Sequence, residues 1–240
     1  VYALSNSPKL TSCSINILKR RKIPIILNQN GVFYPAWYKG NCKNQNLRNL
    51  NLYHCADYIF WQSNFCKKAS DRFLGKRLGK GEILYNAVDT RKFIPVKKHP
   101  DKIFRFLITG NIRKENNYRI YSIIEVFKDI VKENKNIHLY IAGLIEDLVY
   151  FNTQLDASNL RKFITFLGPY TQKDAPMIYQ KADAYITMSF QDNCPSAVIE
   201  AMSCGLPILY SASGGTPELV GKNSGIGLNV SEDWEVINVP

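Results

Sequence analysis

Short runs of apolar residues alternate with stretches of helical periodicity along most of the chain. The clearest case is residues 184–220, where two strand-like apolar runs are each followed by a polar loop and a helical pattern. Pro195 suits the first position of the intervening helix, where its missing N–H would have no partner, and Gly205 supplies the stop. Thr216 is expected to be the N-cap of the next helix. This order predicts a parallel strand–helix–strand unit, with strands at 185–188 and 206–210.

The same alternation covers the rest of the chain and predicts an α/β protein with two lobes. A polar, proline-bounded linker at residues 95–100 separates a first lobe at 1–95 from a second at 96–240. Both lobes are expected to be Rossmann-like, doubly wound parallel sheets, the first one incomplete. The other predicted strands are 1–6, 23–28, 56–61, 82–85, 104–109, 136–142, 163–167 and 226–230. The predicted helices are 9–21, 44–55, 64–73 (capped by Ser63) and 120–134, with one or two more within 144–162.

Candidate chemistry gathers in the two loops at 189–195 and 211–216. Both loops leave the carboxyl ends of strands, and ligands bind at that edge of an open α/β sheet. Free amides near Ser196, Ala197 and Val198, together with the helix dipole, favour an anion there. Gly214 and Gly215 would let the backbone approach a ligand closely. In the alternative interpretation, Ser196, Glu200 and Ser203 form a solvated helix stripe and Asp192 is a capping residue.

Two acidic residues eight apart, Asp192 and Glu200, precede the segments EAMSCGLPI and GGTPELV. This pattern resembles the donor-sugar signature of family 4 (group 1) glycosyltransferases, which are retaining enzymes of the GT-B fold. The resemblance implies that Glu200 holds the nucleotide ribose and that Asp192, with the amides around it, holds the donor sugar and phosphate. It places the nucleobase near Gly168 and Tyr170, and it implies a helix at 171–181 that leads into the sugar-site strand. The substrate-binding residues that it implies in the loop 189–195 and at the start of the next helix are Asn193, Cys194, Pro195 and Ser196, and Gly214 and Gly215 are expected to join them from the loop 211–216.

The loop after the strand 104–109 is the expected clamp for the donor diphosphate. In the resembled family this loop carries an Arg beside a Gly and a Lys further on. Here Asn111 follows Gly110 and Asn116 occupies the Lys region, so a shifted loop would supply cations from Arg113, Lys114 and Arg119. A fixed cation stabilises the charge that sugar–phosphate cleavage leaves on the diphosphate. A solvated basic loop is the alternative. No Asp-x-Asp motif occurs, so neither a metal nor a cofactor is expected beyond the nucleotide-sugar co-substrate.

Charge is distributed unevenly between the lobes. The net charge of +11 arises because residues 1–95 carry 16 Lys and Arg against four Asp and Glu, whereas residues 96–240 carry 15 against 16. A basic first lobe suits an anionic membrane surface, a phosphorylated lipid acceptor or nucleic acid. Ordinary lysine-rich usage explains it equally well. No nucleic-acid recognition motif is present, so nucleic acid is not expected as a partner.

Several further features carry weaker expectations. The aromatic stretch Phe33, Tyr34, Trp37 and Tyr38 either packs the first lobe or faces the acceptor. The glycine series at 75–81 precedes a strand instead of following one, so it is not a dinucleotide fingerprint. Six isolated cysteines indicate reduced thiols, most simply buried. None of His54, His99 and His138 lies in a catalytic context, and His138 is expected to be structural.

These expectations lead to one functional hypothesis and one alternative. The chain is expected to belong to a retaining glycosyltransferase that moves a sugar from a nucleotide-diphosphate donor to a hydroxyl on a glycan or lipid-linked acceptor. The alternative is a non-catalytic nucleotide-sugar-binding or scaffold protein of the same fold. No apolar run approaches the eighteen residues of a membrane span, so a cytoplasmic protein is expected, with peripheral attachment at the inner face of the membrane as a further possibility. Both ends of the chain read as truncated.

Overall fold

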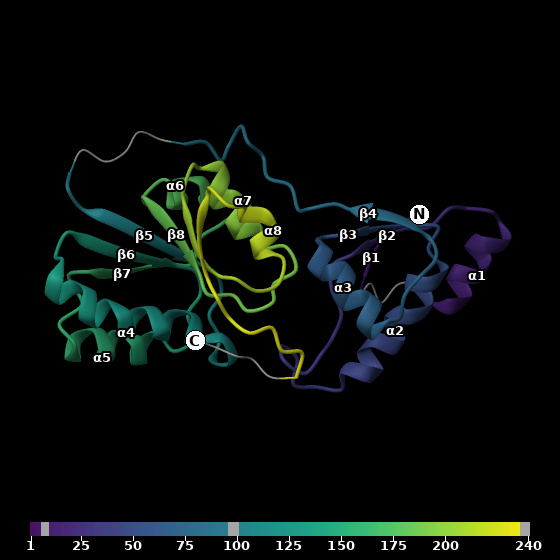
Figure 1. The fold of residues 1–240 in the computed structure, drawn as a ribbon, viewed down its shortest axis with the longest axis horizontal. Coiled ribbons are helices and arrows are strands. Elements are labelled where there is room, and N and C mark those ends of the chain that lie inside the picture. The colour runs from purple at the N-terminus through teal and green to yellow at the C-terminus, as the bar shows by residue number, and fades with distance from the viewer. Residues whose placement is uncertain (6–9, 96–100, 236–240) are drawn as a thin grey trace.

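The protein has two α/β lobes that lie side by side (Figure 1). The computed structural model describes residues 1–5, 10–95 and 101–235. The first lobe holds a four-stranded parallel sheet in the order β1-β2-β3-β4, and the second a six-stranded parallel sheet in the order β10-β9-β8-β5-β6-β7. The strands are β1 (Tyr2–Leu4), β2 (Ile26–Gln29), β3 (Tyr58–Trp61), β4 (Lys80–Ile83), β5 (Phe104–Thr109), β6 (Ile137–Ala142), β7 (Ile164–Gly168), β8 (Ala184–Thr187), β9 (Ile208–Ser211) and β10 (Gly225–Leu228).

The second lobe is doubly wound. The helices α4 and α5 cover one face of its sheet, and α6 and α7 cover the other (Figure 1). Its chain leaves β5 toward β6 and β7, then returns to place β8 on the opposite side of β5, so the connections change direction between β5 and β8. Such a switch point opens a crevice at the carboxyl ends of the strands. The helices of the whole chain are α1 (Ser12–Arg20), α2 (Cys42–Cys55), α3 (Asn64–Phe73), the 3-10 helix η1 (Lys114–Asn116), α4 (Tyr118–Glu133), α5 (Leu148–Ala157), α6 (Ala175–Tyr179), α7 (Ser196–Ser203) and α8 (Thr216–Val220).

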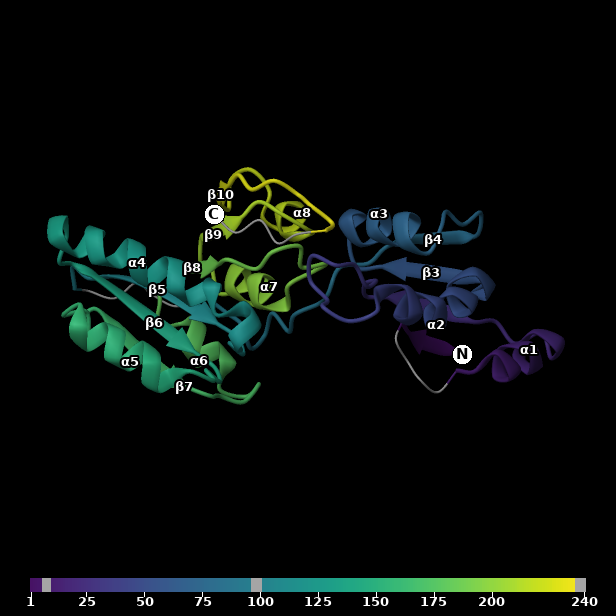
Figure 2. The same cartoon turned by 90° about the horizontal axis from the view of Figure 1, so that it is seen from below.

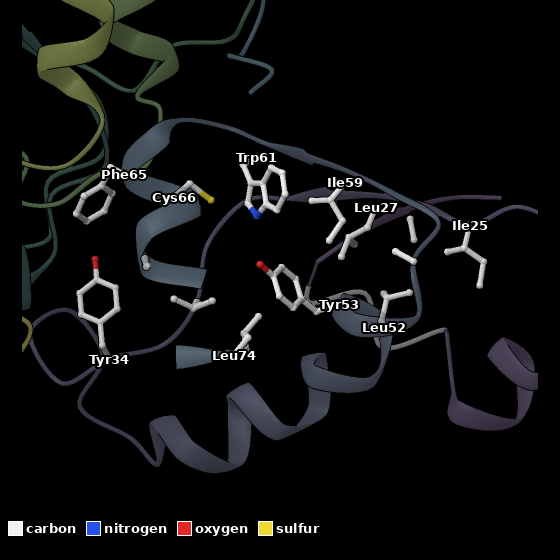
Figure 3. Packing of buried hydrophobic residues seen from close by; sticks show 14 of the residues in the cluster. Ile25, Leu27, Tyr34, Leu52, Tyr53, Ile59, Trp61, Phe65, Cys66 and Leu74 are labelled. Atoms are coloured by element: carbon white, nitrogen blue, oxygen red, sulfur yellow. The ribbon is translucent and has the colours of Figure 1, made fainter. Parts of the chain in front are cut away.

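In the first lobe, the described helices α1, α2 and α3 share one core against one face of the sheet. The strands run in sequential order, and right-handed crossovers then place every helix on the same side. Figure 3 shows this core, where Tyr53 and Leu52 of α2 lie beside Ile59 and Trp61 of β3. The opposite face exposes apolar side chains, with Tyr2 57% exposed. Among the described residues, helices therefore cover both faces of the second sheet but one face of the first, so the predicted doubly wound arrangement holds for the second lobe.

Most predicted elements form, and the differences lie at their ends. Ser63 caps α3 as predicted, because its Oγ accepts the Cys66 N–H at 2.9 Å. Two cap predictions are wrong by one position: Pro195 lies before α7 as its N-cap, and Thr216 is the first residue of α8, after Gly215. The predicted helix 171–181 shortens to α6, because a turn closed by Thr171 and Asp174 precedes it.

Some sequence-based expectations fall on residues 6–9, 96–100 or 236–240, outside the described residues. They concern most of the interlobe linker, His99 and the first residue of the predicted helix 9–21. The described part of the chain contains no helix that is both long and apolar enough to cross a bilayer.

Candidate functional site

A cleft of about 790 Å³ lies between the lobes. The second lobe forms one wall with the loops that follow β5 and β8, the strands at the switch point. The first lobe forms the other wall with the segment after β2. The lining residues are Asn30, Gly31, Trp37, Tyr38, Lys39, Arg113, Glu115, Asn116, Tyr118, Arg119, Phe190, Gln191, Asp192 and Asn193. The cleft thus occupies the edge where the sequence predicted a ligand.

Asp192 is the predicted donor-site carboxylate that lines this cleft. Its Oδ1 accepts the Cys194 N–H at 3.1 Å, and its carbonyl accepts the Gly215 N–H at 2.7 Å. Burial raises the pKa of Asp192, whereas the Cys194 N–H and the charge of Arg119 act in the opposite direction. The carboxylate is therefore an acidic group in a poorly solvated place, with a cation as its neighbour.

The two glycines of the loop after β9 pack against the Asp192 loop. A Cβ on Gly214 would lie 2.5 Å from the Asp192 carbonyl oxygen, and one on Gly215 would lie 2.0 Å from the Asn193 carbonyl oxygen. Gly214 also has a φ of +66°, in the left-handed region. Protein backbone therefore occupies the space that side chains would fill. The first effect of these glycines is to let two loops meet; their direct contact with a ligand stays a prediction.

The loop after β5 and the start of α4 bring two of the three cations that a shifted loop was expected to supply to the wall of the cleft. Arg113 and Arg119 line the cleft, and Lys114 is not among its lining residues. The backbone N–H of Lys114 donates to Glu146 Oε2 at 3.1 Å. The Arg119 guanidinium lies over the ring of Tyr118, and its Nε is buried with no hydrogen-bond partner among the described residues. Arg113 and Arg119 are thus the predicted cations that line the same cleft as Asp192.

Asn111 and Asn116, which stand where the family has cationic residues, form hydrogen bonds that hold the loop after β5 in place. Asn111 Oδ1 accepts the Leu144 N–H at 3.4 Å, and Asn116 Oδ1 accepts the Arg113 N–H at 2.7 Å. A parallel bridge between Ile112 and Ile145 fixes the same loop to the one after β6. Gly110 precedes it with a φ of +140°. These contacts explain why the loop keeps one shape without a cation at either asparagine.

Glu200 lies in a second pocket, of about 300 Å³, beside the segment that joins the lobes. Its Oε1 accepts from Gln172 Nε2 at 2.9 Å and its Oε2 from the Tyr179 hydroxyl at 2.8 Å. The Tyr179 hydroxyl also lies 3.3 Å from Thr109 Oγ1, which ties the carboxylate to the end of β5. A carboxylate has about four acceptor positions, so Glu200 can still accept from two hydroxyls. The other lining residues are Ala87, Val88, Asp89, Lys92, Phe93 and Lys173.

The start of α7 differs in one respect from the prediction of free amides. Because Pro195 lies outside the helix, its carbonyl accepts the Val198 N–H at 3.0 Å, so that amide is not free. Asn86 of the interlobe segment donates from Nδ2 to the Cys194 carbonyl at 2.8 Å and to Ser196 Oγ at 3.2 Å. The sequence analysis missed this role of Asn86.

The loop predicted to meet the nucleobase follows β7. Gly168 has a φ of +77°, and its carbonyl accepts the Gly143 N–H at 2.9 Å. Tyr170 packs against the same core as Tyr179, and burial raises its pKa. Tyr170 therefore lies near the Glu200 side of the site.

The aromatic stretch of the first lobe divides between packing and the cleft. Trp37 and Tyr38 line the cleft, and Trp37 is 47% exposed. Tyr34 is buried, stacks on Phe73 and donates to the Gln191 carbonyl at 3.4 Å. His138 is structural as expected, since it bonds Thr165 Oγ1 at 2.9 Å within the sheet. All six cysteines are free thiols, as expected, but Cys13 is exposed.

A carboxylate that the sequence analysis did not select joins the two lobes. Glu218 of α8 accepts the N–H groups of Asn64 and Phe65, at 2.8 and 2.7 Å, at the first turn of α3. It also accepts from Asn64 Nδ2 at 2.8 Å and from the Tyr85 hydroxyl at 3.2 Å. Figure 2 shows α8 and α3 facing each other across the boundary between the lobes. The only signal in the sequence was its place in GGTPELV.

The two parallel-sheet lobes, with a cleft at the carboxyl edge of the second, define a protein of the GT-B type. The chain belongs to the family of glycosyl transferases group 1, whose model matches residues 89–238. It is 30% identical over 153 residues to the UDP-Gal:alpha-D-GlcNAc-diphosphoundecaprenol alpha-1,3-galactosyltransferase of Escherichia coli, covering 58% of this chain and 38% of that protein. It is 28% identical over 135 residues to spore coat protein SA of Bacillus subtilis, covering 52% of this chain and 34% of that protein.

Solved structures agree on the fold. HepE of Anabaena in complex with UDP and glucose superimposes with a TM-score of 0.72 at 16% identity, covering 95% of this chain and 64% of that one. Sucrose-phosphate synthase from Thermosynechococcus elongatus also gives 0.72 at 16% identity, covering 89% of this chain and 57% of that one. The matched regions span less than two fifths of the two curated relatives described above.

Proposed function

We propose that the complete protein is a retaining family 4 glycosyltransferase that uses a nucleotide-diphosphate sugar. The bond between the anomeric carbon and the phosphate oxygen breaks and the nucleoside diphosphate leaves, the acceptor oxygen takes its place with retention, and the proton of the acceptor hydroxyl passes to the departing diphosphate. The observation that carries this proposal is that Asp192, Arg113 and Arg119 line one cleft at the switch point of the second sheet. The proposal assigns the donor sugar to Asp192 and the ribose to Glu200.

The leaving diphosphate is the group that needs charge stabilisation. Arg113 and Arg119 line the same cleft and can supply it, so the proposed reaction requires no metal ion and no cofactor. A uridine donor is favoured because a structural neighbour is a complex with UDP-glucose.

The acceptor is proposed to enter from the first lobe, past Trp37, Tyr38 and Lys39. A lipid-linked acceptor suits the strongly basic first lobe, and the Escherichia coli relative is named for an undecaprenol-linked one. A basic surface lined by Lys76 and Lys80 flanks Leu78, whose side chain is fully exposed. We infer a cytoplasmic protein that binds the anionic inner face of the membrane through this surface. Nucleic acid is not part of the proposal.

A non-catalytic, nucleotide-sugar-binding or scaffold protein is the second candidate. It is favoured by Asn111 and Asn116, which replace the family's cations and are used for loop structure. Transfer activity separates the two candidates.

The test is a screen of the full-length protein with UDP- and GDP-linked hexoses, scoring donor hydrolysis and binding. Glu200→Gln is expected to weaken nucleotide binding about 10- to 100-fold, because the ribose loses a charged acceptor worth about 1.5–3 kcal/mol. Glu125→Gln, on the outer side of α4 and paired with Lys128, is the matched control and should behave as wild type. If Glu200→Gln bound and turned over donor like wild type, the ribose assignment would be wrong.

A further inference from the structure

The loop after β8 places an uncharged amide against the interlobe cleft. Gln191 borders the cleft and is only 3% exposed, yet neither its Oε1 nor its Nε2 has a hydrogen-bond partner among the described residues. A buried amide without partners costs about 1–3 kcal/mol. Such a group calls for an explanation, and a ligand that enters the cleft would supply the missing partners.

The backbone holds this amide in place. Gln191 has a φ of +52°, a left-handed conformation that a residue with a side chain adopts at a cost. Its N–H donates to Ser213 Oγ at 3.0 Å, and its carbonyl accepts from the Tyr34 hydroxyl at 3.4 Å. One contact comes from each lobe. The surroundings therefore fix the residue in a strained form, which is common where a side chain must be presented to a ligand.

Other polar atoms of the same cleft also lack partners. Asn193 Oδ1 and Arg119 Nε are buried and have none among the described residues. Together with the Gln191 amide they offer acceptors, uncharged donors and one cation. A ring that carries several hydroxyls beside a phosphate matches this set, because the hydroxyls both donate and accept.

We propose that Gln191 binds hydroxyls of the transferred sugar and so helps to select it. This inference rests on the proposed function of the same cleft. Gln191 directly precedes Asp192, whereas Trp37 and Tyr38, along which the acceptor is proposed to enter, belong to the opposite wall. Since both amide atoms are shielded from water, a hydroxyl reaches them only when the groups around them move aside. A site of this kind discriminates strongly, because an ill-fitting sugar leaves the amide unpaired.

The experiment compares the full-length wild type with Gln191→Met in thermal melts. The ligands are UDP or GDP alone and the corresponding nucleotide hexoses. We define the sugar increment as the rise in Tm with the nucleotide hexose minus the rise with the nucleotide alone. Gln191→Met should melt at or above the wild-type temperature without ligand, because an unpaired amide is removed. It should keep the rise with the nucleotide, lose the sugar increment and bind the nucleotide sugar at least tenfold more weakly. Gln154→Met, the same change on α5, is the matched control.

Gln191→Glu provides a second, nearly isosteric variant if the methionine protein does not fold. It should lose the same increment, because the amide donors become acceptors. A full sugar increment in either folded variant overturns the proposal. A preserved increment with a raised KM for the acceptor assigns the amide to the acceptor and also overturns it. If the wild type responds to no nucleotide or nucleotide sugar, the proposed function itself fails, which is a different result.

Discussion

Replacing Glu218 with alanine is expected to release the two lobes from each other. This one carboxylate of α8 accepts two backbone N–H groups of α3, the side-chain amide of Asn64 and the hydroxyl of Tyr85. All four donors belong to the first lobe, and Glu218 belongs to the second. The position also suits a negative charge, because the N-terminus of a helix carries partial positive charge.

The size of the effect follows from these contacts. A hydrogen bond to a charged acceptor contributes about 1.5–3 kcal/mol when buried. Asn64 is exposed, so water replaces part of the loss, and Ser63 still caps α3. We therefore expect Glu218→Ala to cost about 2 kcal/mol of lobe docking, which shifts the closed-to-open equilibrium about 30-fold. The melting of each lobe should change little, since neither core is touched.

Small-angle X-ray scattering of the full-length protein measures this opening directly. Glu218→Ala should have a larger radius of gyration than wild type and a weaker affinity for the nucleotide sugar. Glu133→Ala, which removes an exposed carboxylate from the last turn of α4, controls for the change in charge. Identical scattering curves for Glu218→Ala and wild type would show that this contact does not hold the lobes together.

Two further predictions concern the loops of the cleft. Gly215→Ala should destabilise the protein by about 1–3 kcal/mol and abolish donor binding, because its Cβ would lie 2.0 Å from the Asn193 carbonyl oxygen; an unchanged Tm in a thermal melt would contradict this. Burial raises the pKa of Asp192, so the folded state keeps its proton to a higher pH than the unfolded chain does. The stability from this group should be complete below the ordinary range for Asp and decline as pH rises through the raised pKa. Asp192→Asn should remove that part of the pH dependence in denaturant titrations, and parallel curves for the two proteins would refute it.

Local patterns in the sequence were enough to predict most of the fold. The apolar run at β5 and the capping serine before α3 were predicted residue for residue, because both depend on nearest neighbours. The ends of α7 and α8 shifted by one position, since a proline fits either just inside or just outside a helix start. The strand order could not be read from these patterns, although it creates the switch point.

The site was predictable to the extent that it lies on consecutive residues. Asp192 and Arg119 line the same cleft because both follow strands that adjoin at the switch point, and the sequence had placed each of them in a loop after a strand. Asn86, Glu218 and Gln191 were missed for a common reason. Asn86 and Glu218 act through contacts with residues of the other lobe that are more than 100 positions away in sequence. Gln191 stands out because its amide atoms have no partners among the described residues. Neither feature leaves a signal in the local sequence.

The separation of Asp192 and Glu200 indicates how long a ligand must be to contact both carboxylates. Asp192 lines the cleft between the lobes, and Glu200 lines the pocket beside the interlobe segment. Glu200 lies four residues beyond the first residue of α7, about 6 Å along the helix axis, and Asp192 lies before that helix. A compact ligand cannot use both carboxylates. An extended one can, if its sugar lies at Asp192, its phosphates lie near the start of α7 and Arg119, and its ribose lies at Glu200. A nucleotide-diphosphate sugar has this order of groups, and we infer that the distance between the acidic residues selects for the whole molecule instead of for either end.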